Sequence, residues 1–212
     1  MTLLAASVPA LGQLVYDNSS TSTFNSFGTG FSDIQTFGDY VTLLGGPTTI
    51  TEVSLLLAAE QDVGNPKGNF GLFLYEDNLG VVGNLLGSAV LNNYVFLGNG
   101  GHWLTFSGLS IPVGGSVFVA LSIENYNGDG TFNDFIGVEM YDPPTVGSSD
   151  SDTMLFAFGS GLTAGDAPTA VLDPGLNNIA MTITAVPEPG DYALAAGFAL
   201  AAFGLWRRRA AR

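Results

Sequence analysis

Hydrophobic and polar residues alternate with a period of two over much of the chain between Leu14 and Ala185. This period is typical of β-strands that bury one face, because successive side chains of a strand point to opposite sides. Turns rich in Gly, Asn, Asp and Pro separate the alternating segments. The pattern predicts strands at Tyr40–Leu44, Thr49–Ala58, Asn69–Glu76, Ser88–Phe96, His102–Phe106, Ser116–Ile123, Phe135–Met140, Thr153–Phe158 and Ile179–Ala185.

Two of these segments show the alternation most clearly. In Asn69–Glu76 the apolar set is Phe70, Leu72 and Leu74, and Ser116–Ile123 carries Val117, Val119, Leu121 and Ile123 in the same way. The sequence shows neither a long amphipathic helix nor a repeat of fixed period, so a solenoid or propeller is not expected. We therefore expect an all-β body, an antiparallel β-sandwich or jelly roll.

The C-terminal region has a different character. Val186-Pro187-Glu188-Pro189 is followed by an uncharged apolar run, Tyr192–Trp206, and then by Arg207-Arg208-Arg209. As a helix the 15-residue run would be roughly 22 Å long, which is short for a permanent membrane span. It predicts a single C-terminal transmembrane helix whose basic tail stays in the cytoplasm, with the rest of the protein outside.

This order of elements resembles the PEP-CTERM sorting signal. The resemblance implies recognition of Val186, Pro187, Glu188 and Pro189 by an exosortase-type membrane protease. It also implies an intermediate anchored in the inner membrane of a Gram-negative bacterium, followed by release to the cell surface or extracellular space. The two prolines fit this role, because they hold the segment extended and remove two N–H donors.

The N-terminal end predicts a second targeting element. Leu3–Leu11 is apolar, and the small residues around Gly12 and Gln13 are typical of a signal-peptidase site, although no basic residue precedes the run. A buried N-terminal strand is the alternative. The predicted organisation is a signal-peptide remnant at 1–13, a sandwich ectodomain at 14–185 and the sorting signal at 186–212.

The body resembles the choice-of-anchor ectodomains that often accompany PEP-CTERM signals. The residues that carry this resemblance are Gly38–Gly46, Leu72–Asp77 with Gly83–Leu86, and Gly137–Ser149. It implies a β-sandwich to which no enzymatic activity is generally assigned.

Charge and cysteine content narrow the choice of partners. The chain has 212 residues, no cysteine and a net charge of −14. Between Asp17 and Asp173 there are 17 acidic residues against one lysine, Lys67, a net charge of about −16. Such a body repels phosphate backbones, so nucleic acid is not an expected partner. Disulfides and thiolate metal sites are excluded.

One loop has oxygen-bearing side chains at alternate positions. Asn125, Asn127, Asp129 and Asp134 imitate the first half of a calcium-binding loop, but Ile136 stands where an EF-hand has its bidentate Glu. A plain hairpin loop is the competing interpretation, favoured by the Asn, Gly and Asp content. Calcium is the only cofactor that the sequence suggests.

Catalytic signatures are absent from the sequence. His102 is the only histidine, and it is interpreted as a residue at the edge of a turn. No nucleophile elbow, zincin motif or compact pair of strand carboxylates is present, so no catalytic residues are predicted. Trp103 and Tyr126, near strand ends or loops, are candidates for stacking against sugar rings, as are Tyr94, His102 and Tyr141.

These observations lead to two functional hypotheses. The first is a non-catalytic exported protein, structural or adhesive in exopolysaccharide or biofilm material, processed through the PEP-CTERM pathway. The alternative is a carbohydrate-binding module, with or without calcium.

Overall fold

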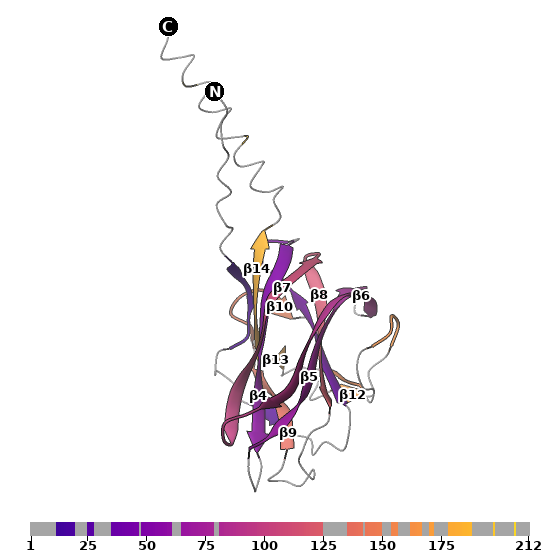
Figure 1. The fold of residues 1–212 in the computed structure, drawn as a ribbon. Coiled ribbons are helices and arrows are strands. Elements are labelled where there is room, and N and C mark those ends of the chain that lie inside the picture. The colour runs from indigo at the N-terminus through magenta and orange to yellow at the C-terminus, as the bar shows by residue number, and fades with distance from the viewer. Residues whose placement is uncertain are drawn as a thin grey trace.

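β-Strands make up the body of the chain and form two antiparallel sheets that pack face to face (Figure 1). The computed structural model describes residues 12–19, 25–27, 35–46, 48–60, 65–78, 81–124, 135–141, 143–149, 154–156, 162–166, 170–171 and 178–187, with Gly197 and Trp206. Every strand pair in these ranges is antiparallel. The prediction of an all-β, antiparallel, two-sheet fold is confirmed.

Sheet A is centred on the long strand β4. Its members are β1 (Gln13–Asp17), β2 (Asn25–Phe27), β4 (Thr48–Glu60), β7 (Gly100–Val113), β9 (Phe135–Tyr141), β13 (Asn178–Ile179) and β14 (Met181–Pro187). β7 pairs with one edge of β4, while β14 and then β9 pair with the other. β1 continues the sheet beyond β14.

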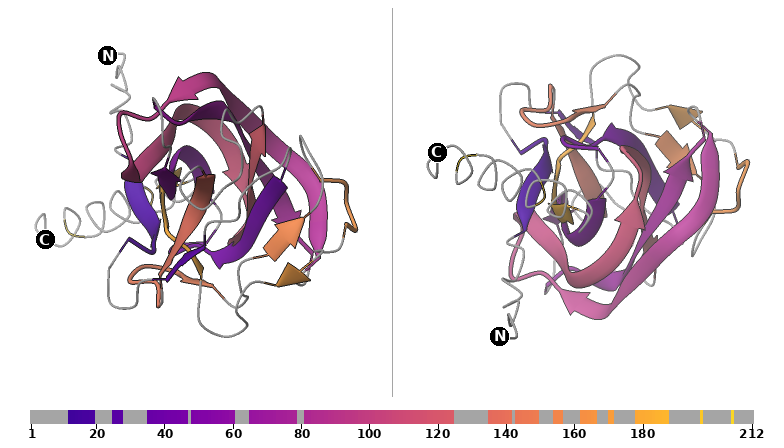
Figure 2. Two further views of the ribbon diagram at one scale, coloured as in Figure 1. Left: turned by 90° about the horizontal axis from the view of Figure 1, so that it is seen from below. Right: turned by 90° about the horizontal axis from the view of Figure 1, so that it is seen from above.

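Sheet B has the order β12-β11-β3-β8-β5-β6, and β10 also pairs with β3. Its members are β3 (Gln35–Thr42), β5 (Lys67–Asp77), β6 (Val82–Val95), β8 (Ser116–Glu124), β10 (Ser148–Ser149), β11 (Met154–Phe156) and β12 (Ala170–Val171). Viewed from either end, the strands of the two sheets surround a common interior (Figure 2).

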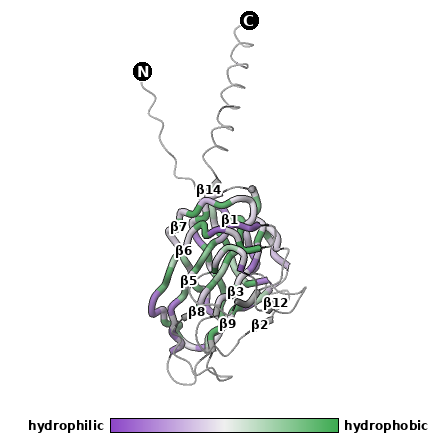
Figure 3. The backbone as a smooth tube through the Cα atoms, turned by 90° about the vertical axis from the view of Figure 1, so that its right-hand side faces the viewer, coloured by the Kyte–Doolittle hydropathy of each residue, from purple (hydrophilic) through white to green (hydrophobic). Residues whose placement is uncertain are grey.

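The main hydrophobic core lies between the sheets. It contains the alternating apolar residues that the sequence pattern selects, and hydrophobic and hydrophilic positions interleave along the strands (Figure 3). From β5 and β8 these are Phe70, Leu72, Leu74, Val117, Val119, Leu121 and Ile123, all at most 2% exposed. Burying so many aliphatic and aromatic side chains is the main stabilising contribution to this fold.

The outer face of sheet B differs from the expectation of one buried face per strand. Tyr75 and Phe118, which point away from the main core, are also buried, in a second cluster with Leu162. The segment 162–166 covers this face, where the Leu162 amide donates to the Tyr75 hydroxyl at 2.6 Å and Gly165 N–H donates to the Val82 carbonyl. The prediction is wrong here because a crossing segment far along the chain supplies the second layer.

Several strands are longer than predicted. β6 begins at Val82 rather than Ser88, and β7 continues to Val113 rather than ending at Phe106. In β7 a bulge absorbs Gly108, whose φ of +72° suits glycine, so the ladder to β4 resumes beyond it. The bulge keeps Ile111 facing the core while Ser107 faces outward.

Candidate functional site

The outer face of sheet A has a regular arrangement of side chains on four neighbouring strands. Residues paired across β7, β4, β14 and β1 share a face, so the register defines the rows. One row is Trp103 and Leu56, the next is Thr105, Ser54, Thr182 and Asp17, and the third is Ser107, Glu52, Thr184 and Leu14. We refer to these ten residues as the sheet A face.

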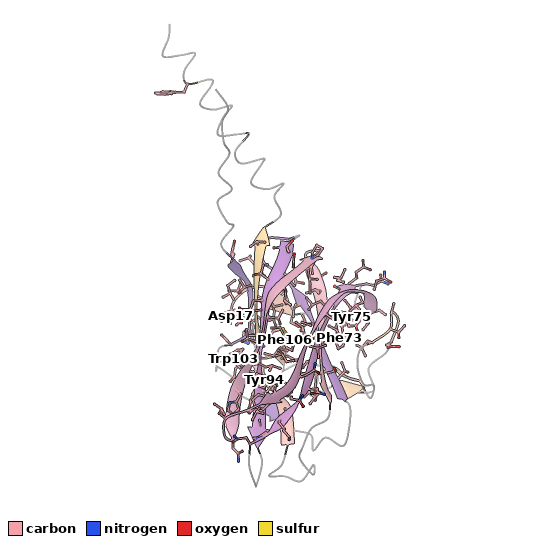
Figure 4. All side chains as sticks on the ribbon, in the orientation of Figure 1. Asp17, Phe73, Tyr75, Tyr94, Trp103 and Phe106 are labelled. Carbon is pink, nitrogen blue, oxygen red and sulfur yellow. The ribbon has the colours of Figure 1, made fainter. Side chains whose placement is uncertain are left out.

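Trp103 is the large aromatic residue of this face, and 42% of its surface is exposed. In Figure 4 it lies on the opposite side of the sandwich from Phe73 and Tyr75, with the core residue Phe106 between. Gly101 precedes it on the same face of β7, and a Cβ there would come within 3.7 Å of Leu56 Cδ1. Because Gly101 has no side chain, β7 itself does not cover that flank of Trp103.

Hydroxyl groups occupy the centre of the sheet A face. Ser54 and Thr105 share a hydrogen bond of 2.9 Å between their hydroxyl oxygens. A hydroxyl in such a pair still has acceptor lone pairs for another partner. Thr105 and Ser107 are exposed, and Thr182 and Thr184 are half-buried.

Two carboxylates complete the face, and its described residues include no basic side chain. Glu52 is half-buried beside Ser107. Asp17 accepts hydrogen bonds from the backbone N–H and hydroxyl of Ser19, which orient its side chain. Lys67, the basic residue of the described ranges, belongs to β5 in the other sheet.

His102 points to the opposite side of β7 from Trp103. Its Nε2 is 2.9 Å from the Gly98 carbonyl, and its ring lies against Phe96 with the centroids 5.1 Å apart. This position at the turn before β7 agrees with its interpretation as a turn-edge residue.

A buried polar cluster closes the free edge of β13. Asp39 reaches across from β3, and its two oxygens accept from the Ile179 N–H at 3.0 Å and the Ser149 hydroxyl at 2.9 Å. The Asn18 side-chain amide donates to the carbonyls of Tyr141, Asn178 and Ile179 at 2.9, 3.0 and 3.1 Å. These side chains satisfy main-chain groups that would otherwise need a neighbouring strand.

Glu139 is a buried acid on the outer side of β9. It is 4% exposed, and its Oε2 has no hydrogen-bond partner within the described part of the chain. Burial raises its pKa from 4.5 to about 7. Burial also raises the pKa of the neighbouring Tyr141, and the charge of Glu139 adds to that effect.

The clefts of the described surface include the following two. The larger, of about 520 Å³, lies beside the β7–β8 turn and is lined by Glu76, Asp77, Asn78, Leu86 and residues 112–114 and 116. The smaller, of about 120 Å³, lies on the outer side of sheet B, between Phe73 and Val90. Neither cleft contains Trp103.

Of the predicted ligand-binding and metal-binding residues, some lie in the described structure and others lie outside it. The structure places Trp103 on the sheet A face, while Tyr141 is only 5% exposed and cannot offer its ring to a ligand. Tyr94 is half-buried against Phe70 and Phe96. Tyr126 lies outside the described residues, as do all the residues predicted as calcium ligands: Asn125, Asn127, Asp129 and Asp134.

The residues predicted as a sorting motif begin inside the last strand. β14 extends two residues past the predicted boundary at Ala185, with Val186 and Pro187 opposite Thr49 and Thr48. The Thr48 hydroxyl donates to the Val186 carbonyl at 2.6 Å. Pro187 can end the strand because the last residue need not donate to the ladder.

The remainder of the predicted C-terminal signal is outside the described residues. This applies to Glu188, Pro189 and Arg207–Arg209, and to the predicted helix except Gly197 and Trp206. Within the described ranges, the structure contains no helix that is both long enough and apolar enough to cross a membrane. In the same ranges, no three acidic or histidine side chains gather where they could share a metal ion.

Comparisons with protein-family models and with curated protein sequences find no match to this chain. The chain's own residues are therefore the basis for its function. The sequence does not predict the buried roles of Asn18, Asp39 and Glu139. Isolated polar residues look alike in a sequence until tertiary contacts bury them. The outward direction of two hydroxyls on the sheet A face can be predicted from the sequence, because Thr182 and Thr184 alternate with apolar residues that are buried in β14.

Proposed function

We propose that this chain is an exported, non-catalytic β-sandwich that is held in the membrane by its C-terminal segment and then released to the cell surface or matrix. An exosortase-type protease would recognise Val186 to Pro189, and the apolar run up to Trp206 would act as the temporary anchor. The sandwich itself would serve as a structural or adhesive component of exopolysaccharide-rich material.

The observation that carries this proposal is the junction between the fold and the motif. β14 ends at Pro187, and the motif continues directly into Glu188 without an intervening linker. The Thr48–Val186 hydrogen bond ties the end of β14 to the start of β4. A protease at the membrane surface would therefore meet Glu188 and Pro189 directly beside a rigid domain.

Replacing Glu188 by glutamine tests the proposal in cells that carry a matching protease. We expect the variant to accumulate in the membrane fraction while the wild type is released. Glu76→Gln is the matched control, since Glu76 is an exposed carboxylate of the sandwich and should leave release unchanged. Equal release of the Glu188→Gln variant and the wild type would overturn the proposal.

A further inference from the structure

The sheet A face combines features that seldom occur together on the surface of a sheet. A tryptophan is 42% exposed on a regular strand, and the next two rows carry hydroxyls and carboxylates, with Leu14 at one end of the third row. Exposed polar residues alone are normal on an outward face, and single exposed apolar residues are also common. The arrangement becomes informative because, on the same face of β7, Trp103 stands between Gly101, which has no side chain, and Thr105, which is exposed.

We propose that the sheet A face binds a neutral saccharide chain, with one sugar ring stacked on Trp103. The apolar C–H face of a pyranose fits an indole ring, while its hydroxyls need nearby donors and acceptors. Thr105, Ser107 and Glu52 supply these groups along the same strands.

The dimensions of the face suit an extended oligosaccharide. Four neighbouring strands at about 4.8 Å spacing make each complete row roughly 14 Å long. The pairing of Thr105, Ser54, Thr182 and Asp17 produces one such row, in which Ser54, only 8% exposed, holds the exposed Thr105 hydroxyl in place through their hydrogen bond. A pre-formed polar row needs little ordering when the ligand binds, so less binding free energy is lost.

Charge argues for a neutral ligand. Glu52 and Asp17 are both acidic, and the described residues of the face include no Lys or Arg to pair with an anion. A polyuronate or sulfated polymer would bring like charges together. Carboxylates instead accept hydrogen bonds well from neutral sugar hydroxyls.

A protein partner fits the same face less well. Stable protein interfaces usually bury about 800 Å² on each side around an apolar centre. Here Leu14, which is 40% exposed, occupies a different row from Trp103, and hydroxyls and carboxylates occupy the positions between them. The apolar residues therefore form no continuous centre.

Intrinsic fluorescence tests the proposal on the purified full chain. The sequence contains two tryptophans, so Trp206→Phe leaves Trp103 as the only indole reporter. We expect a saturable emission change on titration with at least one neutral hexasaccharide from a panel of gluco-, xylo- and manno-oligosaccharides. A second variant, Trp103→Ala, should bind the same oligosaccharide at least about tenfold more weakly than the wild type, as measured by calorimetry.

Matched variants make the result specific. Val90→Ala removes an apolar side chain that is 56% exposed on the outer side of sheet B and should leave binding unchanged. Glu52→Gln and Ser107→Ala should each weaken binding without changing the melting temperature. Trp103→Tyr should retain part of the affinity, because an aromatic face remains.

Three results would overturn the proposal. They are no saturable change with any neutral oligosaccharide, binding that survives Trp103→Ala, and tighter binding to a polyuronate than to its neutral counterpart. A dimer that depends on Trp103, detected by sedimentation, would assign the face to a second copy of the chain instead. The proposal goes beyond the export function, and because the assay uses purified protein without a protease, the two can fail separately.

Discussion

Replacing Glu139 by glutamine preserves the shape of a buried side chain and removes its ability to ionise. Glu139 is 4% exposed, and its Oε2 has no hydrogen-bond partner in the described structure. Folding therefore takes the carboxyl group out of water without supplying a compensating donor to that oxygen. The charged form suffers most, which is why the pKa rises from 4.5 to about 7.

The sign and size of the effect on stability follow from this shift. Between pH 4.5 and about 7 the folded state holds a proton that the unfolded state has lost, so the free energy of unfolding falls as pH rises. At about 1.4 kcal/mol per pKa unit, the whole shift corresponds to roughly 3 kcal/mol as an upper estimate. This stabilisation is complete below the unfolded pKa and is lost as pH rises through about 7.

Thermal unfolding of wild type and Glu139→Gln at a series of pH values measures the difference. At pH 5 the two proteins should unfold at similar temperatures. At pH 8 the variant should be more stable by up to about 3 kcal/mol, or roughly 6–12 °C for a domain of this size. The gap should open mainly between pH 5 and pH 7.

Glu76→Gln is the control, because it removes an exposed carboxylate from the same acidic body. It corrects for the general relief of charge repulsion in a protein of net charge −14. If Glu139→Gln gains no more stability at pH 8 than Glu76→Gln, the explanation by burial is wrong.

Two further substitutions test buried hydrogen bonds. Asn18→Ala removes the side-chain amide that donates to three main-chain carbonyls, so it should lower the free energy of unfolding by about 2–3 kcal/mol. Urea titration measures this loss, and a loss below about 0.5 kcal/mol would show that these hydrogen bonds are unimportant for stability. Tyr75→Phe removes the hydroxyl that accepts the Leu162 N–H, so the free energy of unfolding should fall by about 1 kcal/mol. Hydrogen exchange at the Leu162 amide should become faster, and unchanged exchange there would contradict the role of Tyr75 in holding segment 162–166.

Periodicity alone predicts the centre of the sandwich well. Phe70, Leu72 and Leu74 lie between the sheets as expected, because a strand that buries one face must alternate. The same logic predicts that Trp103 lies on the opposite face of β7 from Leu104 and Phe106. It cannot predict that Tyr75 and Phe118 are buried too, since their cover comes from the distant segment 162–166.

Strand limits and short strands also depend on long-range pairing. The Gly108 bulge does not end β7, because the ladder to β4 resumes beyond it. β2, β10, β12 and β13 are two or three residues long and carry too little pattern to be recognised alone. Their partners in β3, β9 and β11 provide the hydrogen bonds that define them as strands.

The sequence by itself determines the all-β class, the two-residue alternation of the core, the acidity of the body and the order of the proposed sorting elements. These properties depend on local composition and spacing, which the chain carries in any conformation. Only the tertiary structure decides that Asn18 and Asp39 close the edge of β13 and that Glu139 is desolvated. It also decides that Trp103 shares one face of sheet A with hydroxyls from β7, β4 and β14. Those properties require residues far apart in the sequence to meet, and strand register together with the segments that cross the sheets determines which of them do.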